Sequence, residues 1–110
     1  MEIDPVNVVR SMESLEAELG KEWKKNHGLV ENVARETAEY YGAKEVEVAS
    51  LKGAGEPVTI IPQLAKGKCK DELYRKILAE GMLKAHYVRI DILRSQLSAK
   101  KGVLEKFNLI

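Results

Sequence analysis

Hydrophobic residues recur at spacings of three and four over the first forty or so positions, which is typical of amphipathic helices. The pair Asp4-Pro5 favours a helix start, because Asp caps free backbone N–H groups and Pro fits the first turn. A first stripe predicts a helix that ends at 26–28: Val8, Met12, Leu15, Leu19 and Trp23. A second stripe predicts a helix over 29–41, closed by Gly42: Val30, Val33, Ala34, Thr37, Ala38 and Tyr41. We therefore expect a helical hairpin over residues 1–42.

The hydrophobic period changes in the middle of the chain. Polar and apolar residues alternate over 45–48, which is the pattern of a half-buried strand. The segment 58–61 is rich in β-branched residues and stops at Pro62, and the glycines within 51–57 suit a turn. These features predict a β-hairpin over 43–62. Because two strands alone are marginal in water, the hairpin must pack on a helix or pair with a second copy.

A basic loop is expected over 63–70, followed by a long helix over 71–107, a segment without proline. At ~1.5 Å per residue this helix would be roughly 55 Å long. A compact domain of this size is only about 35 Å across. Either the helix breaks, at Gly81 or Gly102, or another subunit covers its overhang.

The long helix carries apolar residues on two nearly opposite faces. One face has mainly large residues at heptad spacing, as in a coiled coil: Leu83, Ile90, Leu93, Leu97, Leu104 and Phe107, with His86 and Lys100 interrupting the row. The other face has mostly small residues: Leu78, Gly81, Ala85, Val88, Ile92, Ser95, Ala99 and Gly102. A helix with two apolar faces needs two partners. The N-terminal helices supply one, and the simplest second partner is another copy of the chain.

Together these elements predict a mainly helical α+β fold in a single domain over 1–110, with coiled-coil-like or bundle packing of the long helix. The chain is 45% hydrophobic and 32% charged, which fits a globular protein. Charged residues interrupt its first twenty positions, so we expect no signal peptide and no membrane span. The expected location is the cytoplasm, and no membrane partner is predicted.

Charge is unevenly distributed along the chain. Residues 1–56 hold twelve acidic and seven basic side chains, whereas residues 66–110 hold five acidic and eleven basic ones. Such a split either marks a surface for nucleic acid or lets the acidic half cover the basic half, within or between subunits. The formal net charge of +1 makes long-range attraction of phosphates weak, which favours the second interpretation.

Candidate residues for chemistry are few and far apart. His27 is interpreted as a residue of a helix end, and His86 as a buried or register-setting polar residue in the apolar row. Cys69 lies between two lysines just before a helix, which favours a lowered thiol pKa. No histidine lies near Cys69 in the sequence to activate it as a nucleophile. We therefore predict no catalytic residue, no metal site and no cofactor.

The sequence favours a non-enzymatic protein that assembles into a dimer or higher homo-oligomer by protein–protein contacts of its long helix. The expected interface residues are Leu83, Ile90, Leu93, Leu97 and Leu104. The alternative is a small accessory protein that binds DNA or RNA through phosphate contacts. Its candidate residues are Lys66, Lys68, Lys70, Arg75 and Lys76. A small enzyme is the third and least supported hypothesis, because no general acid, base and nucleophile come together by spacing.

Overall fold

The computed structural model describes residues 3–108. The first helix, α1 (Pro5–Lys24), begins where the sequence predicted it. The Asp4 Oδ1 atom accepts a hydrogen bond of 3.0 Å from the Val6 backbone N–H, and Pro5 occupies the first turn. After α1 the Lys25 backbone N–H donates to the Glu22 carbonyl at 3.1 Å. The break between the first two helices therefore falls at Lys25, just before the expected 26–28 segment.

The second helix, α2 (Asn26–Gly53), is much longer than the predicted helix over 29–41. It continues through Gly42, which the sequence pattern marked as a helix end. The chain turns only after Gly53, and Gly55 has a φ of 77°, a left-handed conformation that glycine adopts without strain. The predicted apolar stripe of this helix is also rotated, because Val30 and Tyr41 are exposed whereas Tyr40 is buried.

The predicted β-hairpin over 43–62 is wrong. Residues 45–48 belong to α2, where Val46 is 67% exposed while Glu47 and Val48 are half-buried. Residues 58–60 form a turn, and Pro62 lies in the first turn of the next helix. A helix satisfies the backbone hydrogen bonds of this segment locally, whereas an isolated hairpin is marginal. Helix α2 also buries Leu51 in a cluster with Ile61 and Ala65, against which Val48 packs.

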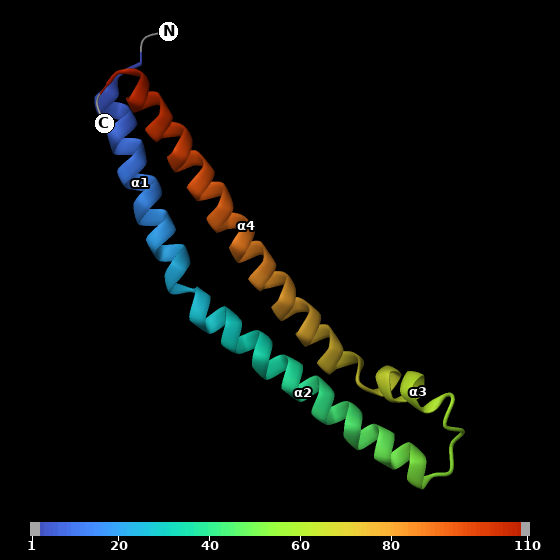
Figure 1. Ribbon diagram of the computed structural model, residues 1–110. Coiled ribbons are helices and arrows are strands. Elements are labelled where there is room, and N and C mark those ends of the chain that lie inside the picture. The colour runs from blue at the N-terminus through green and yellow to red at the C-terminus, as the bar shows by residue number, and fades with distance from the viewer. Residues whose placement is uncertain (1–2, 109–110) are drawn as a thin grey trace. The chain divides into compact units, whose positions relative to one another are not determined.

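The remaining helices are α3 (Ile61–Lys68) and α4 (Lys70–Lys106). The expected basic loop over 63–70 is therefore wrong, because most of it is helical. The long helix predicted over 71–107 is confirmed. It runs through Gly81 and Gly102 without a break (Figure 1).

These four helices contain most of the described chain, and residues 3–108 form no strand, so the α+β class is replaced by an all-helical one. Two compact units can be distinguished. Unit 1 comprises residues 1–27 and 84–110, and unit 2 comprises residues 28–83. The expectation that 1–110 behaves as a single domain stays a prediction. None of the helices within 3–108 is both long enough and apolar enough to cross a membrane.

Unit 1 is built from α1 and the C-terminal part of α4, which lie side by side (Figure 1). Its buried side chains come from both helices: Val8, His86, Ile90, Leu93 and Leu104. Unit 2 is built from most of α2, from α3 and from the first part of α4. Three of its buried side chains are large and three are small: Tyr40, Leu51 and Ile61, and Ala65, Cys69 and Ala79. The guanidinium of Arg75 on α4 lies 3.3 Å from the Glu36 carboxylate on α2 and links these helices inside unit 2.

Candidate functional site

The five residues predicted for an oligomer interface lie on the inner side of α4. Ile90, Leu93 and Leu104 are buried in unit 1, where α1 packs against α4, and Leu97 is half-buried there. Leu83 belongs to unit 2 and is also half-buried. Burial is thus confirmed for Ile90, Leu93 and Leu104, whereas Leu83 and Leu97 are only half-buried and Phe107, expected in the same row, is 46% exposed. Because the five predicted interface residues are already buried or half-buried within one chain, they leave little free surface for a second copy.

The second apolar row of α4 lies on the side away from the buried residues. We call it the outer face and define it by Leu78, Gly81, Ala85, Val88, Ile92, Ser95 and Ala99. All of these residues are exposed, including Leu78 at 49%, Val88 at 57% and Ile92 at 44%. The second apolar row is therefore exposed over residues 78–99, whereas Gly102, the last residue of the predicted row, is half-buried.

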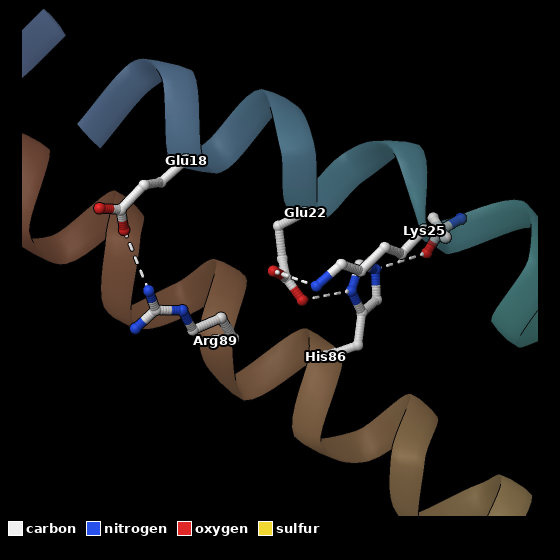
Figure 2. A network of polar contacts seen from close by, with 6 residues as sticks. Glu18, Glu22, Lys25, His86 and Arg89 are labelled. Carbon is white, nitrogen blue, oxygen red and sulfur yellow. Dashed lines mark hydrogen bonds and ion pairs between the residues drawn. The ribbon is translucent and has the colours of Figure 1, made fainter. Parts of the chain in front are cut away.

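A polar network interrupts the apolar packing of unit 1. The His86 ring is only 3% exposed, and its Nδ1 atom lies 3.2 Å from Oε1 of Glu22. Its Nε2 atom lies 3.2 Å from Oδ1 of Asn26 at the start of α2. Lys25 lies beside them, with Nζ 3.3 Å from Oε2 of Glu22 (Figure 2). The interpretation of His86 as a buried histidine with polar partners is confirmed.

The electrostatics of this network centre on Glu22. Its pKa is lowered, mainly because His86 donates a hydrogen bond to the carboxylate, and the nearby Lys25 ammonium adds to the effect. Partial burial works against this lowering, because desolvation disfavours the charged carboxylate. In the orientation of Asn26 seen here, both ring nitrogens of His86 face oxygen atoms.

Aromatic and charged side chains surround the network in unit 1. The Trp23 ring meets His86 edge-on, with 6.4 Å between ring centroids. The Arg94 guanidinium lies 5.2 Å from the centroid of Trp23, within cation–π range. One turn from His86, the Arg89 guanidinium bonds the Glu18 carboxylate at 3.0 Å (Figure 2). These contacts fix α1 against α4 in register.

Sequence reasoning missed the partners of His86, although a signal for them exists. Glu22 and Asn26 continue the heptad spacing of Leu15 and Leu19, so both fall on the inner side of the first helical segments. His86 occupies the same kind of position on α4. Polar residues at inner positions of two facing helices indicate that they meet, because a buried polar group requires a hydrogen-bond partner.

The five candidate phosphate-binding residues lie in unit 2, at the end of α3 and the start of α4. Most of their charge is already balanced by acidic side chains. Lys68 lies 3.7 Å from Glu47, Lys76 lies 2.6 Å from Glu80, and Arg75 contacts both Glu36 and Glu39. Lys66 and Lys70 form no ion pair within residues 3–108. The candidate surface is thus reduced to these two lysines.

Cys69 lies between α3 and α4 and is buried. Burial raises the pKa of its thiol, and the carboxylates of Glu72 and Glu47 raise it further. The sequence-based expectation of a lowered pKa is therefore wrong, because burial and these two carboxylates outweigh the nearby cationic side chains. Within the described part of the chain, no group of three or more His, Cys, Asp or Glu residues is arranged to hold a metal ion.

Comparison with protein-family models, curated proteins and solved structures finds no match to this chain. Any assignment of function therefore rests on the helices and their exposed surfaces alone.

Proposed function

We propose that this protein is a non-enzymatic assembly protein whose copies associate through the outer face of α4. The observation that carries the proposal is the exposure of Leu78, Val88 and Ile92 in one row of a single helix. Their neighbours Gly81, Ala85 and Ser95 have little or no side chain, so a second helix can approach closely between the large residues.

The hydrophobic effect supplies the driving force. Removing one large aliphatic side chain from water is worth about 1.5–3 kcal/mol when burial is complete. In a symmetric dimer both copies bury the same exposed residues, so each of these positions contributes twice to the interface. Soluble monomers rarely leave a contiguous apolar surface uncovered, and such surfaces commonly mark interaction sites. This proposal differs from the sequence-based hypothesis in its residues, because it uses the outer face instead of the buried leucine row.

The alternative, binding of DNA or RNA phosphates, has less support. Ion pairs engage Lys68, Arg75 and Lys76, and a phosphate would have to compete with their carboxylate partners. Only Lys66 and Lys70 would meet a nucleic acid without that competition. A protein that neutralises so few phosphates gains little affinity from counterion release. Salt-dependent binding of DNA or RNA that disappears in a Lys66→Gln/Lys70→Gln protein would restore this hypothesis.

Sedimentation equilibrium over a range of protein concentrations tests the assembly proposal. We expect wild type to have a mass greater than one chain at tens of micromolar. Val88→Glu/Ile92→Glu should raise its dissociation constant by at least roughly tenfold, which corresponds to about 1.4 kcal/mol. Val46→Glu is the matched control, because Val46 is exposed on α2 instead of α4. Circular dichroism checks that all the variants stay helical. A wild-type mass of one chain, or equal weakening by the control, would contradict the proposal.

A further inference from the structure

The order of large and small residues on the outer face differs between its two ends. Leu78 comes first and is followed by Gly81 and Ala85, whereas Val88 and Ile92 come later and are followed by Ser95. In a second copy that runs in the opposite direction, small residues therefore lie opposite the large residues of the first copy. Two such rows can interdigitate, so that the large side chains of one helix fill the space beside the small residues of the other.

Charged residues along one edge of the outer face also complement each other when a second helix runs in the opposite direction. Lys84 and Asp91 are seven positions apart, so they lie on the same edge of α4. Both are exposed, and neither forms an ion pair within residues 3–108. A second α4 helix that runs in the opposite direction would bring Asp91 next to Lys84, and the symmetry would create this pair twice.

A parallel arrangement fits less well. In a parallel pair in register, identical residues of the face meet, so Gly81 faces Gly81 and Ile92 faces Ile92. Two glycines leave a gap, and two isoleucines compete for the same space. The edges would also place Lys84 near Arg89 of the other copy, because flanking residues five positions apart meet in parallel coiled coils. Arg89 is already bonded to Glu18 of its own chain, so this arrangement gives Lys84 no carboxylate partner, whereas an antiparallel pair gives it Asp91.

We infer that two copies pack with their α4 helices antiparallel, so that Gly81 of one copy faces Ile92 of the other and Lys84 lies beside Asp91. Ala85 then faces Val88, and the two-fold axis crosses the outer face between these two residues. On the other edge Met82 meets Arg89, so no like charges face each other there. This inference rests on the proposed self-association and specifies the orientation and register of the partner helix.

Charge reversal tests the register. Lys84→Asp and Asp91→Lys each place like charges together, and each should raise the dissociation constant by roughly tenfold at low salt. The double variant Lys84→Asp/Asp91→Lys restores opposite charges and should recover an affinity close to that of wild type. Lys101→Asp is the matched control, because Lys101 is exposed on α4 but lies off the outer face. Its dissociation constant should stay near that of wild type.

The outcomes separate the two proposals. If wild type has the mass of one chain at tens of micromolar, the proposed function fails and the register fails with it. If Val88→Glu/Ile92→Glu weakens the dimer but the single charge reversals do not, self-association stands and the register is wrong. Failure of the double variant to recover affinity also overturns the register.

Disulfide cross-linking tests the orientation directly in a protein whose native Cys69 is replaced by alanine. A mixture of Ala85→Cys and Val88→Cys chains should cross-link on oxidation, because facing positions bring their Cα atoms into disulfide range. Ala85→Cys alone should cross-link poorly, since in an antiparallel pair Ala85 does not face itself. Efficient cross-linking of Ala85→Cys alone, together with poor cross-linking of the mixture, would show a parallel pair and overturn the inference.

Discussion

The two units use α4 in different ways. In unit 1 this helix contributes the large buried side chains of Ile90, Leu93 and Leu104. In unit 2 it contributes the small buried Ala79, while bulk comes from Tyr40 and Leu51 on α2. Either helix of a packed pair can supply the large side chains that fill the interior, so substitutions along one continuous helix can have different effects. Shortening a buried α4 side chain should lower stability in unit 1, and enlarging a buried α4 side chain should lower stability in unit 2.

The largest effect is expected from Leu93→Ala in unit 1. Leu93 is 1% exposed, so its truncation removes buried apolar surface and leaves a cavity. The free energy of unfolding should fall by about 2–5 kcal/mol. Urea denaturation measured at one fixed protein concentration checks this value, because self-association adds to apparent stability. Val9→Ala on α1 serves as the exposed control and should change stability by about 0.5 kcal/mol or less. Equal losses in the two variants would show that Leu93 is not an interior residue.

Enlargement in unit 2 is expected to have the next largest effect. Ala79 is buried, and Ala79→Leu inserts three carbon atoms where α4 has only a methyl group. Overpacking of this kind typically lowers stability by about 1–3 kcal/mol. Ala38→Leu is the control, since Ala38 is exposed on α2 of the same unit and lies off the outer face. If Ala79→Leu is as stable as wild type in urea, unit 2 has space beside α4 and the proposed contrast between the units is lost.

Local start, stop and periodicity signals explain which parts of the fold the sequence predicted. Helix α1 was predicted because Asp4-Pro5 marks its start, and α4 because its apolar periodicity continues without proline. Helix α2 was cut short because Gly42 resembled a helix end. The inner side of α2 includes half-buried Glu36 and Glu47, and such a mixture gives no clear apolar stripe. An alternating pattern over four residues was then interpreted as a strand, although four residues also make one helical turn.

The candidate surfaces were predictable to different degrees. The outer face of α4 follows directly from residues seven positions apart. The neutralisation of Arg75 by Glu36 and Glu39 does not, because it depends on which turn of α2 faces which turn of α4. The same holds for Cys69, whose burial reverses the direction of its pKa shift. Local sequence shows which residues are charged, but only packing decides which charges remain available.

Two glycine substitutions locate the end of α2, with an expected effect of about 1 kcal/mol each. Gly42 lies inside this helix, and a Cβ atom added there meets no other atom within 4 Å. Gly42→Ala should therefore stabilise the protein by about 0.5–1 kcal/mol, because alanine loses less conformational entropy in a helix. Gly55→Ala should destabilise it by roughly 1–2 kcal/mol, since an alanine is strained at a φ of 77°. Thermal unfolding measures both signs, and the opposite pair of signs would place the helix end at Gly42.

The smallest effect concerns Glu22 in the polar network of unit 1. Its pKa is lowered in the folded protein, mainly by the hydrogen bond from His86, so folding favours the charged carboxylate. This contribution to stability is present above the ordinary glutamate pKa of about 4.5 and is lost as the pH falls through the lowered pKa of the folded state. A Glu22→Gln protein cannot lose it, so its unfolding free energy should decline less steeply than that of wild type below about pH 4.5. Glu13→Gln is the matched control, because Glu13 is an exposed carboxylate of the same helix, and its acid limb should follow wild type. Superimposed acid limbs for Glu22→Gln and wild type would show that the carboxylate–imidazole bond does not distinguish the folded state from the unfolded one.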